Sequence, residues 1–307
     1  MQRYQYWREP RVTMEDENGL LLRSDDRLKD SRVSRASLQK ILLSPEEDVG
    51  LEKQFEKTQT ELWTDLFRQC AGRTIMVRLP DMLFDCLLPQ TDEEFACIAA
   101  MFQCAEEELR QEAERLTMRH RLCCCEAYHF DAQYLRLFEL QIRSIMHGAE
   151  RGGCTLFSML LPCGGNVDEI GLLCGLVDGI AAESCVCCSL GIEIATPKAA
   201  CEVQQYIGFT DFLVFDTEAL TQKMYGISEG DAVDAVSYYM KNGWFEQSPF
   251  CSFDQTGLGT LLLFSIERAR HKKHEIRIGL MGKPACEPVG IAFCRENKVD
   301  LLCESKG

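Results

Sequence analysis

Basic residues are scarce in this sequence relative to its acidic content. Lysine and arginine total 33 against 48 aspartate and glutamate residues, which gives a formal net charge of −15 at pH 7. Proteins that bind nucleic-acid phosphates or anionic membrane surfaces use clustered lysine and arginine. We therefore expect neither nucleic acid nor a membrane as a partner.

Long apolar runs and a leader segment are also lacking. No stretch approaches the roughly 18 consecutive apolar residues that indicate a membrane-spanning helix, and residues 1–5 do not open a secretory signal. The final residues Ser305-Lys306-Gly307 are similar to the peroxisomal S-K-L signal but lack its leucine. We expect a cytoplasmic protein, with the cytoskeleton as one candidate location.

Metal-ligand spacing is missing although the chain has 18 cysteines. The runs at 123–125 and 185–188 lack the paired C-x2-C spacing of a tetrahedral zinc site, and no H-x3-5-H follows them. A long chain without a secretory signal indicates reduced thiols. Because most of the cysteines lie in apolar runs, we expect them to be buried as small hydrophobes.

Short apolar runs alternate with amphipathic segments along almost the whole chain. Several runs are apolar without alternation, as in strands that are buried on both faces. Segment 91–118 opens with a capping box formed by Thr91 and Glu94. The predicted strands are residues 19–22, 74–78, 121–124, 155–161, 190–194, 212–215, 276–280 and 299–303. The predicted helices are residues 51–70, 91–118, 132–148, 167–182, 197–207, 232–242, 256–271 and 287–297.

This alternation predicts an α/β protein, a parallel (β/α)8 barrel with segment 91–118 as a helical insertion after the second strand. Residues 1–18 form an N-terminal arm, and residues 19–307 form one barrel domain. No helix follows the last predicted strand, so we expect an uncovered apolar flank between the first and last strands. A protein partner in a larger assembly would cover this flank, with residues 4–7 as its anchor. The acidic segment 91–118 is a second predicted contact, for a basic partner.

Residues 212–222, FLVFDTEALTQ, form an apolar run that ends in polar residues. Such a strand is typical of the active-site end of an α/β barrel. The position where a metal-binding carboxylate would be expected is Ala219. The segment therefore poses the question of whether this site still works.

Seven motifs occur in an order that resembles the C-terminal phosphoenolpyruvate/pyruvate-binding barrel of pyruvate phosphate dikinase. More distantly, the chain is similar to Enzyme I of the bacterial sugar phosphotransferase system and to phosphoenolpyruvate synthase. The resemblance runs from about Gly19 to Ser305. The motifs are GLLLRSDD at 19–26, VRLPD at 77–81, LLPQTDEE at 87–94, ELQIRSI at 139–145, TPKAA at 196–200, TEALTQ at 217–222 and SPFCSFDQTGLG at 248–259.

The resemblance implies a Mg²⁺ site that this sequence has lost. The two family carboxylates that hold Mg²⁺ correspond to Ala195 and Ala219. A hard cation prefers carboxylate oxygens, which a methyl group cannot supply. Glu218 is next to Ala219 in the sequence, but neighbouring strand residues point to opposite faces, so it does not easily replace the lost ligand. Glu193 could share a face with Ala195 but would lie about 6–7 Å lower in the barrel. We expect no metal cofactor.

The resemblance also implies a proton-transfer cysteine and several phosphate-binding arginines. The cysteine position is Met281, whose thioether has no exchangeable proton. The arginine positions are Glu126, His129 and Glu229. Carboxylates in these places repel a polyanionic substrate.

Two arginines of the family pattern remain, Arg23 and Arg78, with Asp81 beside the second. They predict either residual binding of a small anionic ligand, a carboxylate or phosphate, or structural salt bridges with Asp81 or Asp216. None of the five histidines lies in the T-S-H setting of the family's phosphohistidine domain.

Three functions follow from the resemblance. The first is a catalytically inactive, dikinase-like barrel, a pseudoenzyme that serves as a structural or interaction module in a larger assembly. The second is a sensor of phosphoenolpyruvate- or pyruvate-type anions. The third is a phosphotransferase subunit that acts with partner domains on another chain.

Overall fold

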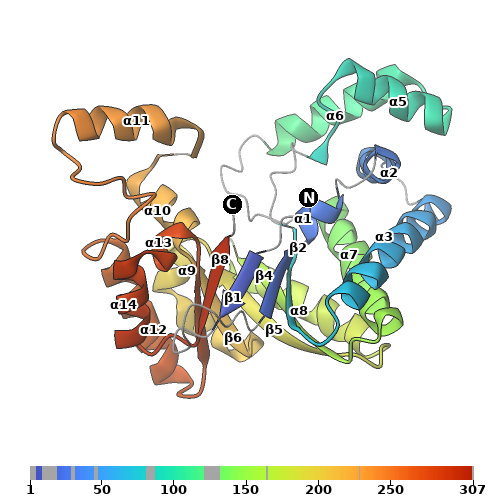
Figure 1. Ribbon diagram of the computed structural model, residues 1–307. Helices are drawn as coiled ribbons and strands as arrows, with labels where there is room; N and C mark the ends of the chain where they lie inside the picture. Colours follow the sequence, from blue (N-terminus) through green and yellow to red (C-terminus); the bar gives the residue numbers. More distant parts are fainter. Residues whose placement is uncertain are drawn as a thin grey trace.

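The computed structural model describes residues 5–8, 19–28, 32–44, 48–80, 87–120, 132–163, 165–227 and 229–305. Its strands form a closed barrel in the order β1 to β8 (Figure 1). Seven of them run parallel, and they are β2 (Gly19–Arg23), β3 (Thr74–Arg78), β4 (Leu156–Cys163), β5 (Cys187–Ile194), β6 (Phe212–Asp216), β7 (Arg277–Met281) and β8 (Leu301–Ser305). The predicted α/β barrel is confirmed.

The remaining place in the barrel is filled by β1 (Gln5–Arg8), which is antiparallel to both of its neighbours. It pairs with β2 from Gln5–Leu21 to Trp7–Gly19 and with β8 from Gln5–Ser305 to Arg8–Leu302. We predicted a strand at 121–124 between β3 and β4, but β3 pairs directly with β4. Residues 121–124 themselves lie outside the described residues.

The prediction of an uncovered flank between the first and last barrel strands is therefore wrong. Part of the predicted arm forms β1 and occupies the backbone edges of both β2 and β8. The apolar side chains of these strands are buried, with Leu20, Leu22 and Leu302 at most 4 % exposed. A four-residue strand has too short a pattern to be recognised in the sequence.

Alternate residues of the strands fill the inside and cover the outside of the barrel. The inner group consists of Leu21, Met76, Leu160, Phe212, Val214, Met281, Leu301 and Cys303. The outer residues pack against the surrounding helices, as in other closed barrels. The Phe212 ring packs against Gly191, where an added Cβ would lie 2.2 Å from the ring. The inside of the barrel is thus a packed core below the strand ends.

Helices surround the barrel. They are α1 (Ser24–Leu28), α2 (Arg32–Leu43), α3 (Val49–Gln69), α7 (Ala132–Gly152), α8 (Val167–Ala181), α9 (Pro197–Cys201), α10 (Thr217–Tyr225), α11 (Glu229–Lys241), α12 (Leu258–Lys272), α13 (Lys283–Cys286) and α14 (Pro288–Glu296). The short 3-10 turns Val203–Gln205 and Ile207–Phe209 follow α9. No helix among the described residues is long and apolar enough to cross a membrane.

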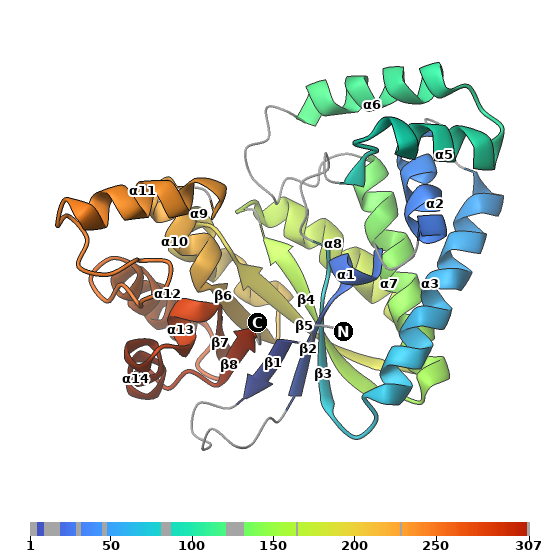
Figure 2. The ribbon, with the colours of Figure 1, turned by 45° about the horizontal axis from the view of Figure 1, so that its top comes forward.

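The predicted helix at 91–118 is two helices, α5 (Asp92–Phe102) and α6 (Glu106–His120). They separate at Gln103, which takes a left-handed conformation with φ of 51°. The Thr91 cap is present, because its Oγ1 accepts from the Glu94 N–H at 3.3 Å. In Figures 1 and 2, α5 and α6 lie beyond the C-terminal ends of the strands on one side, and α11 lies there on the other.

The cysteines are less uniformly buried than predicted. Those that are buried are Cys70, Cys163, Cys174, Cys294 and Cys303, whereas Cys185, Cys187, Cys201 and Cys251 are exposed. Cys185 and Cys187 lie at the N-terminal end of β5, where the strand has not yet entered the core. The described part of the chain holds no group of three side chains that could bind a metal ion.

Candidate functional site

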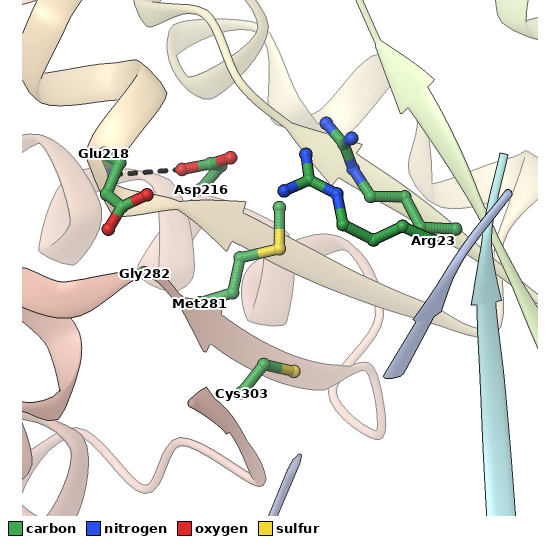
Figure 3. Close-up of a pocket in the computed structure, with 7 residues that line it drawn as sticks. Arg23, Asp216, Glu218, Met281, Gly282 and Cys303 are labelled. Carbon is green, nitrogen blue, oxygen red and sulfur yellow. Dashed lines mark hydrogen bonds between the residues drawn. The ribbon is translucent and has the colours of Figure 1, made fainter. Parts of the chain in front are cut away.

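A small cavity of ≈ 60 Å³ opens at the C-terminal ends of the barrel strands (Figure 3). This end of a parallel barrel carries the active site in enzymes of this architecture. The residues that line it are Arg23, Arg78, Asp216, Glu218, Met281, Gly282 and Cys303. They come from the ends of β2, β3, β6 and β7, from the middle of β8, and from the segments that follow β6 and β7.

Arg78, the last residue of β3, is neutralised by carboxylates of the protein. Its Nε and Nη2 donate to the two oxygens of Glu193 at 2.5 and 2.7 Å, a bidentate pair. Its Nη1 also lies 3.6 Å from Asp25 Oδ2. Arg78 is 3 % exposed and Glu193 is fully buried. Glu193 and Asp25 are therefore partners of Arg78. The predicted partner Asp81 lies outside the described residues.

Arg23, the last residue of β2, is more open. Its side chain is 40 % exposed, and its contact with Asp25 is a loose one, with Nε 4.0 Å from Oδ2. The guanidinium lines the cavity. Of the two arginines predicted to bind an anion, Arg23 is the one whose geometry leaves its charge available to a ligand.

Asp216 ends β6 and caps α10 at the same time. Its Oδ1 accepts from the N–H groups of Glu218 and Ala219, both at 2.9 Å. Burial raises the pKa of this carboxyl to about 7; the charges of Glu193 and Glu218 also raise it, whereas the Ala219 N–H and Arg78 lower it. Asp216 is thus a carboxyl that changes charge close to neutral pH.

Glu218 and Thr217 tie the start of α10 to the loop after β7. The Lys283 N–H donates to Glu218 Oε1 at 2.9 Å, and Thr217 Oγ1 donates to the Met281 carbonyl at 2.7 Å. Gly282 lies between these contacts with φ of 102°, and an added Cβ there would lie 2.8 Å from Thr217 Oγ1. These contacts between the loop after β7 and the start of α10 fix the side of the cavity that Glu218 and Gly282 line.

Two sulfur-containing side chains lie in the cavity. Met281 occupies the position of the proton-transfer cysteine implied by the resemblance. Cys303 also lines the cavity, which we did not predict, although its place at the end of the last predicted strand, residues 299–303, was a usable signal. Burial, followed by the nearby Cys286, Glu193 and Asp216, raises the Cys303 pKa well above its ordinary value, so its thiol stays protonated at neutral pH.

The residues at the metal positions do not fit the Mg²⁺ that the resemblance implies. Ala195 follows β5 and is 3 % exposed, and its carbonyl accepts from Lys223 Nζ at 3.0 Å. Ala219 lies in the first turn of α10, where its N–H is bonded to Asp216. Glu193, the nearest carboxylate along β5, is already bound to Arg78.

Three further predicted positions are not brought into the site by the described structure. Glu126 and His129 lie outside the described residues. Glu229 begins α11, and its side chain is not among those described. Their roles stay predictions.

Known proteins match this chain over most of its length. Pyruvate, phosphate dikinase from Rhizobium meliloti (strain 1021) is 28 % identical over 287 residues, which are 87 % of this chain and 31 % of that protein. The chloroplastic enzyme from Mesembryanthemum crystallinum is 25 % identical over 291 residues, which are 91 % of this chain and 30 % of that protein. The chain thus spans less than a third of the length of these relatives.

A family profile also matches most of the chain. The profile of the PEP-utilising enzyme, PEP-binding domain, matches residues 39–306, nearly the whole barrel. This match covers β3 to β8 and the residues that end them. The chain belongs to the PEP-utilising enzyme family, whose PEP-binding domain it represents.

Proposed function

We propose that this barrel has lost the phosphoenolpyruvate–pyruvate chemistry of its relatives and serves as a structural and interaction module in a larger assembly. The observation that carries the proposal is the Arg78–Glu193 pair. The fully buried carboxylate of Glu193 accepts two hydrogen bonds from the Arg78 guanidinium, which would otherwise be available to bind an anionic substrate. The protein's own side chain thereby replaces the substrate charge.

The other side chains of the pocket support the same proposal. Proton transfer to an enolate requires a group with an exchangeable proton within reach of the carbon. Met281 has none, and Cys303, with its raised pKa, is a poor base at neutral pH. Ala195 and Ala219 offer no side-chain oxygen to a metal ion that would stabilise the enolate.

The direct test is deuterium exchange at the methyl group of pyruvate, in the presence of Mg²⁺ and a phosphohistidine domain from a relative. We expect exchange at the solvent rate. Thermal melting with millimolar Mg²⁺ should coincide with melting in NaCl of matched ionic strength, since a ligand that binds only the folded state would raise the stability. Exchange above the solvent rate that disappears in Arg23→Ala would overturn the proposal, and would favour a subunit that acts with partner domains in trans.

A second candidate function is binding of a small anion without catalysis. The exposed guanidinium of Arg23 favours it. Oxalate, an enolate mimic, is a suitable probe, and its binding without any pyruvate exchange would support a sensor over a purely structural barrel.

The interaction role draws support from an aromatic cluster on α11 and the loop that follows it. Tyr238 and Trp244 are 59 % and 62 % exposed, and their rings lie 5.7 Å apart. Exposed aromatic residues of this kind are common anchors in protein interfaces. A photo-crosslinker at Trp244 should give one adduct of defined mass in native cells, and Tyr238→Ser should abolish it. The same crosslinker at Leu172, 60 % exposed on α8, is the control and should give no such adduct.

A further inference from the structure

The two sides of the pocket carry opposite charges. Figure 3 shows the carboxylates of Asp216 and Glu218 on one side and the Arg23 side chain on the other, with Met281 between them and Cys303 beneath. Arg78 adds little net charge because Glu193 neutralises it. One available cation therefore faces two carboxyl groups.

Each of these groups keeps hydrogen-bonding capacity that faces a ligand. Asp216 uses Oδ1 for the two N–H groups of α10, and Glu218 uses Oε1 for the Lys283 N–H. Among the described residues, no hydrogen bond to their other oxygens is present. Within the described part of the chain, the ion pair of the Arg23 guanidinium is the loose one with Asp25. All three side chains are partly exposed, so these oxygens and the guanidinium are accessible to a bound molecule.

We propose that the pocket binds a small zwitterion, an α-amino acid with a short apolar side chain. Its carboxylate would bind Arg23, its ammonium group would bind Asp216 and Glu218, and its side chain would contact Met281. The inference rests on the proposed loss of the family's metal site, because a bound Mg²⁺ would compete with the ammonium group for the same carboxylates.

The charges of the pocket favour binding of a zwitterion over binding of the polyanionic substrates of the family. A polyanion gains one cation at Arg23 but meets two carboxyl groups across a small cavity, where like charges repel strongly. A zwitterion places one charge of each sign against its opposite. The cavity of ≈ 60 Å³ is small, which restricts the ligand to the smallest α-amino acids. Such a small ligand has few contacts, so we expect a Kd in the micromolar to millimolar range.

The test is a calorimetric titration of the full chain with three molecules of similar size. L-Alanine carries both charges, pyruvate lacks the ammonium group, and isopropylamine lacks the carboxylate. We expect L-alanine to bind at least about tenfold more tightly than either, because only it satisfies both walls.

Substitutions separate the two walls. Asp216→Asn keeps the cap of α10, since asparagine caps helices as well as aspartate does, and it should weaken L-alanine binding about tenfold or more without weakening pyruvate. Arg23→Gln should weaken both. Glu218→Gln is the second acidic-wall variant should Asp216→Asn fold poorly. Glu202→Gln, whose side chain pairs with Lys198 outside the pocket, is the control and should bind like the wild type.

The inference is overturned if pyruvate binds as tightly as L-alanine, if neither acidic-wall variant affects L-alanine, or if L-alanine does not bind at millimolar concentration. These outcomes are distinct from failure of the proposed function. Methyl exchange on pyruvate would overturn the pseudoenzyme proposal whether or not L-alanine binds. If the protein neither catalyses methyl exchange on pyruvate nor binds L-alanine, only the proposal of a zwitterion site is overturned.

Discussion

Asp216 caps a helix, and its surroundings disfavour the ionised form of its carboxyl group. Its Oδ1 caps α10. The charged groups that face it are Arg78 from β3, Glu193 from β5 and Glu218 from α10, and burial outweighs the favourable ones. Its folded-state pKa of about 7 lies above the ordinary value of 3.8. Between these two values the folded state binds more protons than the unfolded chain, so stability falls as the pH rises through this window.

The Asp216→Asn variant should remove this pH dependence while it retains the helix cap. From about pH 4 to about pH 7 the wild type should lose stability relative to the variant, by up to a few kcal/mol at about 1.4 kcal/mol per pKa unit. Above this window the difference should stay constant. Urea unfolding at several pH values measures it. Parallel stability curves for the two proteins across the window would contradict the raised pKa.

At the scale of elements, α3 and α7 are in unusually close contact. An added Cβ at Gly148 of α7 would lie 2.4 Å from the Trp63 Cβ of α3, and one at Gly152 would lie 2.7 Å from the Phe67 Cβ. Trp63 and Phe67 are at most 1 % exposed, so neither can move into solvent. Glycine at both positions therefore sets the separation of the two helices.

Gly148→Ala should destabilise the protein by about 1–3 kcal/mol, because the new methyl group forces a well-packed interface apart. Gly175→Ala in α8 is the matched control, since a Cβ there meets nothing within 4 Å. The control should gain about 0.5–1 kcal/mol from the higher helix propensity of alanine. Thermal melting of both variants tests the pair. Equal shifts in melting temperature for the two variants would show that α3 and α7 accommodate the new methyl group without loss of stability.

At the scale of the whole molecule, the barrel is closed by a strand of four residues. β1 pairs with β2 and β8 and leaves neither with a free backbone edge. Closure of this kind removes the exposed edges through which sheets associate. The partner expected at the uncovered flank is therefore not needed there, and we place the proposed contact on the exposed aromatic residues near α11 instead.

Tyr6→Pro should open the barrel. A strand that is paired on both sides has no position where proline avoids the loss of a ladder hydrogen bond. We expect a lower melting temperature together with new binding of a hydrophobic dye, as the apolar residues of β2 and β8 become accessible. Tyr6→Thr, which retains a strand-forming residue, is the control and should bind no dye. An unchanged melting temperature in Tyr6→Pro would show that β1 does not hold the barrel closed.

The class of fold and the end of the barrel that carries the pocket could both be predicted from local patterns in the sequence. Apolar runs such as 212–215 are local patterns, and parallel strands bring their C-terminal residues to one end of a barrel. Arg23, Arg78 and Asp216 could therefore be placed together from their positions at the ends of predicted strands. Ala195, Ala219 and Met281 could be assigned from the motifs that surround them.

How these residues pair could be seen only in the three-dimensional structure. Arg78 binds Glu193, 115 residues away in the sequence, a pair that the sequence analysis did not predict. The place that we gave to residues 121–124 is taken by direct pairing of β3 with β4, and β1 closes the barrel. Which strand edges meet, and which charge faces which, depends on contacts between distant segments. A periodic pattern read along a short stretch of chain reports burial, but it carries no information on these long-range partners.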